Sequence, residues 1–217
     1  MENSRAIVRG FLIAWAPMLV VAIAAMLLNE KLALHARINC CHASWLDHFF
    51  AAFTHVADGW VPTALALFIL LVLDIRSFLM MGLSCSLSAI IAQTLKRGFF
   101  AEHGRPSMHR DSLGAMDWVD GIDLHAMLSF PSGHSTAAFS MCLALAVIMD
   151  RRTWAVPLAL FAALLAFSRV YLSQHFLVDI TAGSAIGTLT AVGVAYWLYQ
   201  SPFACRPWLF RRVLRRR

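Results

Sequence analysis

Long apolar stretches alternate with short polar ones along most of this chain. A bilayer core about 30 Å thick is crossed by roughly 17 to 25 apolar residues in an α-helix. Six stretches come near that requirement, the second by extending an uncharged run back to His55, and they are 10–28, 55–73, 77–95, 135–149, 154–167 and 177–200. The pattern therefore predicts an all-α polytopic membrane protein, a bundle of six transmembrane helices.

The first apolar stretch follows Arg5 and Arg9, an arrangement that signal sequences and N-terminal membrane anchors share. Its uncharged run, 10–28, is longer than the roughly 7 to 15 apolar residues of a typical signal. We therefore expect an uncleaved anchor. A cleaved signal is the alternative, and it leaves the sidedness of the later helices unchanged.

Lysine and arginine are unevenly divided between the two sets of connecting segments. Short cytoplasmic loops collect basic residues, whereas exported loops do not. With the N-terminus inside, the inner face receives 11 of the 18 basic residues, namely Arg5, Arg9, Arg76, Arg151, Arg152, Arg206, Arg211, Arg212, Arg215, Arg216 and Arg217. We expect both termini in the cytoplasm and the opposite helix ends on the periplasmic or extracytoplasmic side of a plasma membrane, the inner membrane in a bacterium.

Composition agrees with a membrane protein, since 60% of the residues are hydrophobic and only 14% are charged, far from the balance of a soluble domain. A net charge of +6 is also found in nucleic-acid binders, but here the basic residues gather at membrane ends instead of lining a soluble face. We expect no nucleic acid and no obligate protein partner. The basic cytoplasmic tail at 201–217 is most simply a topological determinant, with anionic lipid headgroups as the alternative partner.

One membrane domain, 1–217, is expected, with a core at about 46–198. Two extramembrane segments have appreciable size. In the first, 29–58, apolar side chains spaced three and four apart predict an interfacial helix on the outer leaflet, and they are Trp45, Leu46, Phe49, Phe50 and Phe53. Simple packing is its plainer role, and a gate for lipid entry is the alternative. The second segment, 96–133, is polar and is the expected catalytic loop.

Basic residues near the predicted outer helix ends suit the binding of a phosphate. A phosphoryl group in transfer carries negative charge on its equatorial oxygens, and a catalyst without a metal has to surround them with cations and backbone donors. Lys96, Arg105 and Arg169 supply the cations, and the planar fork of arginine donates two bonds to one phosphate. Ser132 and Gly133 precede a predicted helix whose first N–H groups and positive dipole end attract an anion.

Two histidines and a carboxylate complete the candidate chemistry. His175 and Asp179 are four residues apart, so they share one face of a helix. A carboxylate there holds one imidazole N–H and leaves the other nitrogen free to attack phosphorus. His175 is therefore the predicted nucleophile. His134 is then available to protonate the leaving oxygen and afterwards to activate water.

No metal or other cofactor is expected. The chain has no C-x-x-C pair or other zinc spacing. The remaining polar residues of the expected catalytic loop are more simply solvated than metal-bound, and they are His103, His109, His125, Asp111, Asp117, Asp120 and Asp123. An acidic rim that discriminates between phosphorylated headgroups, or recruits a cation, is the alternative for the aspartates.

Together these motifs resemble the type 2 phosphatidic acid phosphatase superfamily, membrane lipid phosphatases related to the vanadium haloperoxidases. The second part of the family signature is complete as Pro131-Ser132-Gly133-His134. The third part is complete as Ser168-Arg169, five residues, His175, three residues and Asp179.

The first part of the signature departs from the family pattern. The family has about six residues between a lysine and Arg-Pro, whereas eight separate Lys96 from Arg105-Pro106 and seven separate Arg97 from it. We choose Lys96 as the phosphate-binding cation, with Arg97 as the alternative.

The resemblance implies a six-helix bundle with its active site at the outer ends of the helices. It also implies metal-independent hydrolysis of a lipid phosphate monoester or pyrophosphate through a phosphohistidine. Similarity to bacterial members leaves three substrate classes open: undecaprenyl pyrophosphate, phosphatidylglycerol phosphate and the phosphate groups of lipid A. A protein that binds or translocates a phospholipid without hydrolysis is the alternative, although binding alone needs no nucleophile, orienting carboxylate and acid. The haloperoxidases are soluble, so the apolar spans disfavour that activity.

Overall fold

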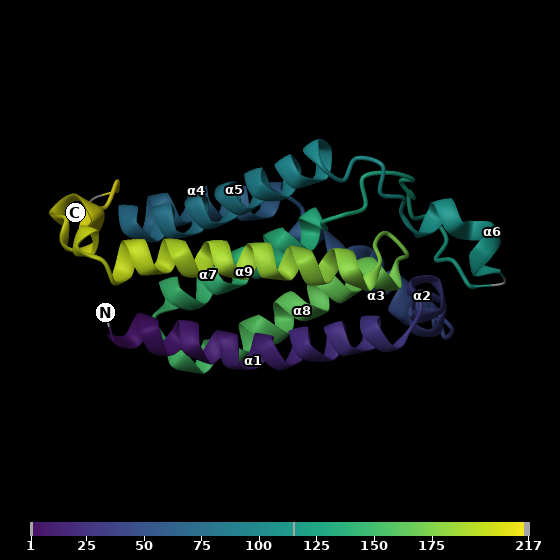
Figure 1. Cartoon of the computed structure of the whole chain (residues 1–217). Helices are drawn as coiled ribbons and strands as arrows, with labels where there is room; N and C mark the ends of the chain where they lie inside the picture. The colour runs from purple at the N-terminus through teal and green to yellow at the C-terminus, as the bar shows by residue number, and fades with distance from the viewer. Residues whose placement is uncertain (1, 115, 215–217) are drawn as a thin grey trace.

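The computed structural model describes residues 2–114 and 116–214, and over these residues the chain is a helical bundle without strands. The long helices lie side by side with their axes roughly aligned (Figure 1). They are α1 (Glu2–Leu28), α4 (Trp60–Val72), α5 (Ile75–Gly98), α7 (Gly133–Met149), α8 (Ala155–Tyr171) and α9 (Leu177–Tyr199). The predicted all-α class is confirmed.

Four helices are long and apolar enough to cross a membrane: α1, α5, α9, and α8 together with the short η3 (Arg152–Trp154). A fifth span results if α4 is joined to the segment Ser44–Ala57 before it, from which it is bent by 51°. The helix α7 is apolar but has only 17 residues. Each of the six predicted stretches is thus largely helical, while six crossings remain a prediction.

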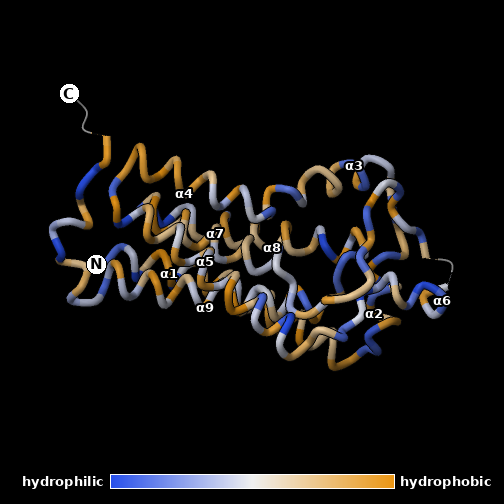
Figure 2. The backbone as a smooth tube through the Cα atoms, turned by 90° about the horizontal axis from the view of Figure 1, so that it is seen from above, coloured by the Kyte–Doolittle hydropathy of each residue, from blue (hydrophilic) through white to orange (hydrophobic). Residues whose placement is uncertain are grey.

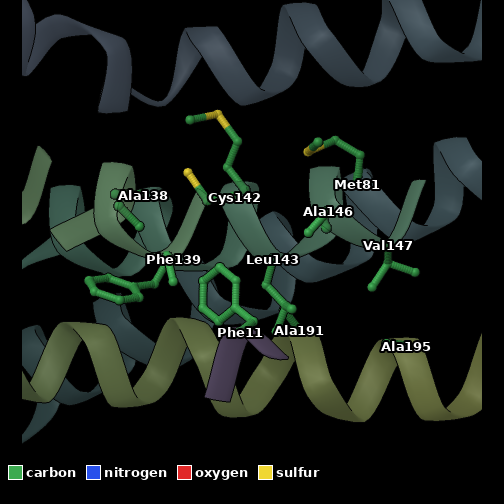
Figure 3. Close-up of a cluster of buried hydrophobic side chains, with 14 of the residues drawn as sticks. Phe11, Met81, Ala138, Phe139, Cys142, Leu143, Ala146, Val147, Ala191 and Ala195 are labelled. Carbon is green, nitrogen blue, oxygen red and sulfur yellow. The ribbon is translucent and has the colours of Figure 1, made fainter. Parts of the chain in front are cut away.

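The core of the bundle is built around α7, whose side chains are buried on nearly every face. Phe139 and Leu143 point toward Phe11 of α1 and Ala191 of α9, whereas Cys142 points to the opposite side (Figure 3). A helix that is apolar all round has to be enclosed by others. The outer helices instead expose apolar side chains on their outward faces, among them Val20, Leu67, Phe68 and Leu160, as expected for surfaces that contact lipid.

Two glycines let α7 and α9 approach closely. A Cβ atom on Gly183 would lie 2.5 Å from the carbonyl oxygen of Ser132, and one on Gly187 would lie closer still to that of Thr136. No side chain fits at either position. Small residues four apart on a helix are a common means of bringing membrane helices into contact, and here they fix the first turn of α7 against α9.

The two ends of the bundle differ in character. The N-terminus and the described C-terminal end lie together at one end, whereas α2 (Lys31–Ile38), α3 (Ser44–Phe53) and α6 (Arg110–Leu113) lie at the other (Figure 1). Polar segments concentrate at both ends, and the middle is mainly apolar (Figure 2). Which end of the bundle lies on which side of a membrane stays a prediction.

The predicted interfacial segment is more divided than the sequence suggests. It consists of α2, α3 and the single turn η1 (Thr54–Ala57). Only part of its apolar stripe faces outward: Phe50 is buried against Tyr171, with ring centroids 4.6 Å apart, whereas Trp45 and Phe49 are exposed.

The predicted basic tail is partly folded onto the bundle. It forms the short turns η4 (Pro202–Cys205) and η5 (Pro207–Phe210). The carbonyl oxygen of Arg211 accepts a hydrogen bond from the N–H of Ile75, and the Arg76 guanidinium stacks on the ring of Phe210. Arg215, Arg216 and Arg217 lie outside the described residues.

Candidate functional site

The helix α5 ends, and α9 begins, at the end of the bundle opposite the chain termini (Figure 1), and the candidate residues belong to these and neighbouring helix ends. Four elements contribute through their terminal turns, and the α5–α7 and α8–α9 connections contribute the rest. The predicted residues lie as follows: Lys96 in the last turn of α5, Arg105 in the α5–α7 connection, Ser132 as the N-cap of α7, Gly133 and His134 in its first turn, Arg169 in the last turn of α8, His175 in the α8–α9 connection and Asp179 in the first turn of α9.

A tight connection between α8 and α9 positions His175. The carbonyl oxygen of Arg169 accepts hydrogen bonds from the N–H groups of both Gln174 and His175, at 2.9 and 3.1 Å. Ser173 takes up the left-handed conformation that this reversal requires, with φ of 51°. The five residues between Arg169 and His175 therefore form one compact turn.

Asp179 holds the His175 imidazole. Its Oδ2 lies 3.3 Å from His175 Nδ1, and the same oxygen accepts hydrogen bonds from the Phe176 N–H at 2.9 Å and from the Ser129 hydroxyl. A carboxylate fixed by these donors favours the tautomer that carries its proton on Nδ1. The Nε2 lone pair of His175 is then free for nucleophilic attack.

Burial keeps His175 uncharged. The residue is 1% exposed, and burial, opposed by the hydrogen bond to Asp179 and reinforced by the charge of Arg105, lowers the pKa of His175 to about 3. Desolvation disfavours the charged form of any titratable group. The imidazole is therefore neutral near pH 7, as attack on phosphorus requires.

Three buried cations gather around this pair. Lys96, Arg105 and Arg169 are each less than 10% exposed, and the charges of Arg105, Asp179 and Arg169 all act on Lys96. Neighbouring Arg97 is exposed, so burial favours Lys96 over Arg97 as the cation of the displaced first motif.

The guanidinium of Arg169 keeps donors available for a ligand. Its Nη1 donates to the hydroxyl of Thr54 at 3.0 Å. Its Nε is buried and has no hydrogen-bond partner in the part of the chain that the structure describes. An unpaired buried donor costs free energy unless a ligand satisfies it, so this nitrogen is a donor that an anionic ligand would satisfy.

In Arg105, by contrast, most of the guanidinium N–H groups donate hydrogen bonds to oxygens of the protein. Its Nε and Nη2 donate to the carbonyl oxygens of Met127 and Leu128, at 3.0 and 3.5 Å. Its Nη1 donates to the backbone and side-chain oxygens of Gln174, at 3.2 and 3.1 Å. In this conformation Arg105 ties loop 123–128 to the α8–α9 connection, so binding a phosphate fully requires it to exchange partners.

The start of α7 differs in one detail from the sequence expectation. The N–H of Ser132 is not free, because it donates to the carbonyl oxygen of Asp179 at 3.0 Å, and the Ser132 hydroxyl caps α7 by accepting from the Ser135 N–H at 3.4 Å. The N–H groups that follow, of Gly133 and His134, lie in the first turn, where a helix has no internal acceptors. They are the donors that this helix end presents to an anion.

His134 has a carboxylate partner that sequence reasoning missed. Its Nε2 lies 2.8 Å from Asp58 Oδ1, and the other oxygen of Asp58 lies 2.8 Å from His55 Nδ1. Ser129, Thr54 and Gln174 were also missed, and nothing in the sequence marks them. Asp58 could have been found, because it is a charged residue within a predicted membrane span, where charge usually has a function.

Two cavities open at this end of the bundle. One of about 350 Å³ is lined by residues that include Thr54, Asp58, His134 and Arg169. The other, of about 530 Å³, is lined by residues that include Lys96 and Arg105. His125 of loop 123–128 lines both. Within the described residues, no group of three or more His, Cys, Asp or Glu side chains is placed to hold a metal ion.

Comparison with known families matches residues 76–203 to the PAP2 superfamily. The chain belongs to the PAP2 superfamily. The matched range spans α5 to α9 and contains every predicted site residue. Asp58, Thr54 and His55 lie before it.

Relatives of this PAP2 chain include two proteins named lipid A 4'-phosphatase. One, from Porphyromonas gingivalis, is 30% identical over 52% of this chain and 48% of its own length. The other, from Bacteroides thetaiotaomicron, is 24% identical over 74% of this chain and 71% of its own length. The chain thus spans about half the length of the first relative.

Solved structures share the fold. The crystal structure of Aquifex aeolicus LpxE matches 76% of this chain and 93% of its own, with 26% identity and a TM-score of 0.65. That of a transmembrane PAP2-type phosphatidylglycerolphosphate phosphatase from Bacillus subtilis matches 94% of this chain and all of its own, with 22% identity and a TM-score of 0.61. The second likeness concerns the fold alone.

Proposed function

We propose that this PAP2 protein hydrolyses the phosphate ester of a membrane lipid through a phosphohistidine. The observation that carries the proposal is the buried His175–Asp179 pair surrounded by Lys96, Arg105 and Arg169. Cations and helix N–H groups stabilise the charge of a phosphoryl group in transfer. The site supplies these groups from its own side chains, so the proposed reaction is independent of metal.

The proposed reaction has two steps. Nε2 of His175 attacks phosphorus as the bond to the lipid oxygen breaks, and His134 gives its proton to that oxygen, which leaves as the lipid alcohol. A water molecule, deprotonated by His134, then attacks the phosphohistidine. The N–P bond breaks, inorganic phosphate leaves and both histidines regain their starting states. Arg105 exchanges loop carbonyls for phosphate oxygens during this cycle.

We propose a phosphate group of lipid A as the substrate. The names of both curated relatives support this class. Undecaprenyl pyrophosphate and phosphatidylglycerol phosphate are the competing substrates. The site is proposed to face the periplasm with both termini in the cytoplasm, in accord with the distribution of basic residues and with the opposed positions of site and termini.

The test is phosphate release by the detergent-purified full chain in the presence of EDTA. The substrates are lipid A bisphosphate, undecaprenyl pyrophosphate and phosphatidylglycerol phosphate, and the control is His175→Ala. We expect release from lipid A, with a loss of roughly 10⁴-fold or more in the variant because the nucleophile is gone. Mass spectrometry of the product identifies which phosphate is removed.

Each other outcome has a definite meaning. Release from another lipid would replace the substrate and keep the reaction. Full activity of His175→Ala would remove the phosphohistidine. No release from any lipid by a folded protein would favour non-hydrolytic binding or translocation.

A further inference from the structure

The carboxylate of Asp58 lies between two imidazoles. Oδ1 lies 2.8 Å from Nε2 of His134 and Oδ2 lies 2.8 Å from Nδ1 of His55. His134 is in the first turn of α7, whereas Asp58 sits at the bend where η1 gives way to α4. The contact therefore joins segments 76 positions apart in the chain.

This contact lies in the wall of the smaller cavity. Asp58, His55 and His134 line the same cavity of about 350 Å³ as Arg169. The charges that act on His134 are those of Arg169, Arg105 and Asp58. Burial opposes an imidazolium at His134 most strongly, and the two positive charges oppose it as well. Asp58 is the charge in this set that stabilises one.

The hydrogen bond also decides which nitrogen of His134 is available. Nε2 is committed to Asp58, so exchange of a proton with the substrate or with water falls to Nδ1. A carboxylate on one imidazole nitrogen orients the ring, fixes the tautomer and stabilises the cation that forms when the other nitrogen takes a proton. Asp179 holds the His175 ring in a similar way.

We propose that Asp58 is a positioning residue for His134, and that the two form a second histidine–carboxylate pair serving the acid–base steps. The inference rests on the proposed phosphatase function and deepens it. Asp58 holds His134 toward the leaving oxygen and stabilises its protonated form in the first step. It stabilises the same form when His134 takes a proton from water in the second.

The decisive experiment varies the leaving group. The parameter kcat/KM covers the steps up to the first irreversible one, cleavage of the ester. A nitrophenoxide leaves readily without a proton, whereas an alkoxide needs one, so loss of acid assistance harms alkyl esters more. The substrates are p-nitrophenyl phosphate, phenyl phosphate, a short-chain alkyl phosphate and lipid A bisphosphate, each with wild-type chain and with Asp58→Asn.

For Asp58→Asn we expect kcat/KM to fall by roughly 10²-fold on the alkyl phosphate and on lipid A, and by less than about tenfold on p-nitrophenyl phosphate. Asp58→Glu, which keeps the charge, should recover part of the loss on the alkyl ester. Equal losses on all esters, or no loss, would overturn the inference. If Asp58→Asn is not recovered as a monodisperse protein, Asp58→Ser keeps a polar group without charge and is read by the same contrast.

Two matched control variants distinguish the positioning of His134 by Asp58 from a general effect of the substitution on packing. Asp47, on α3, accepts a hydrogen bond from the Tyr171 hydroxyl at 2.6 Å and is not among the residues that line the cavity. Asp47→Asn should affect all esters alike. His55→Gln removes the other partner of Asp58 and should leave most of the dependence on the leaving group intact.

The controls also separate the inference from the proposed function. If the wild-type chain releases phosphate from none of these esters, nor from undecaprenyl pyrophosphate or phosphatidylglycerol phosphate, the proposed function fails. If the wild-type chain is active and Asp58→Asn shows an unchanged dependence on the leaving group, the inference alone fails.

Discussion

The two histidines of the site are held by carboxylates that the chain supplies in opposite ways. His175 and Asp179 are four residues apart, and their side chains are 2% and 3% exposed. His134 and Asp58 come from distant segments and are 28% and 27% exposed. The role of nucleophile that we propose for His175 requires a neutral and fixed imidazole, which burial favours. The proton exchange that we propose for His134 requires access to water, which the cavity wall allows.

The largest effect should come from breaking the buried pair. Asp179→Asn removes the charge that orients His175, and the amide favours the wrong tautomer. We expect kcat to fall by roughly 10³- to 10⁴-fold, on p-nitrophenyl phosphate as on lipid A. Phosphate release with both substrates measures this, and a loss confined to the alkyl leaving group would give Asp179 the role we assign to Asp58.

A smaller effect should distinguish the two basic residues of the displaced motif. Lys96 is buried among the site charges, whereas Arg97 is exposed. Lys96→Ala should lower kcat/KM by roughly 10²-fold, because a cation near the transferring phosphoryl group is lost. Arg97→Ala, the matched control, should lower it by less than about tenfold. The reverse order in phosphate release would assign the phosphate contact to Arg97.

The distance between the His175–Asp179 pair and the His134–Asp58 pair should depend on Gly183. Any Cβ there meets the backbone of Ser132 and the side chain of Ser135, so Gly183→Ala has to displace α7 from α9. Overpacking of this kind costs about 1–3 kcal/mol. We expect a lower Tm and a loss of roughly tenfold in kcat from misplacement of His134.

Gly193 on the same helix provides the control for that change. Nothing lies within 4 Å of a Cβ atom at Gly193, so Gly193→Ala should be neutral or slightly stabilising. Equal Tm values for the two alanine variants would show that the close approach of α7 and α9 is not limiting.

The last effect concerns the pH dependence of stability, not catalysis, and arises next to the buried pair. His35 of α2 lies 3.2 Å from the Ser173 hydroxyl, and burial, opposed by Asp179 and reinforced by Lys31, lowers the pKa of His35 from 6.5 to about 4. The unfolded chain takes up this proton first, so the stabilisation is complete above pH 6.5 and is lost as pH falls toward 4. The loss is on the order of 3 kcal/mol.

Thermal unfolding in detergent at pH 7 and pH 4.5 measures this contribution. His35→Gln should show a smaller drop in Tm between the two pH values than the wild-type chain. His48→Gln, which changes an exposed histidine, should behave as wild type. An identical drop in all three proteins would exclude His35 as a source of acid lability.

The amino-acid sequence by itself determined the apolar helices, the family and the local half of the site. These features depend on residues close together in the chain: runs of apolar side chains, the helix start after Ser132, and the turn from Arg169 to His175 with Asp179 one helical turn further on. Local spacing fixes which side chains share a helix face.

Only the tertiary structure decided the part of the candidate site that depends on contacts between distant segments. The contact of Asp58 with His134, the hold of Arg105 on loop 123–128 and the burial of Lys96 rather than Arg97 all depend on how distant segments pack. Spacing along the chain carries no information about such contacts. They are set where α7 meets α9 across glycines and where the bend before α4 brings Asp58 to the cavity.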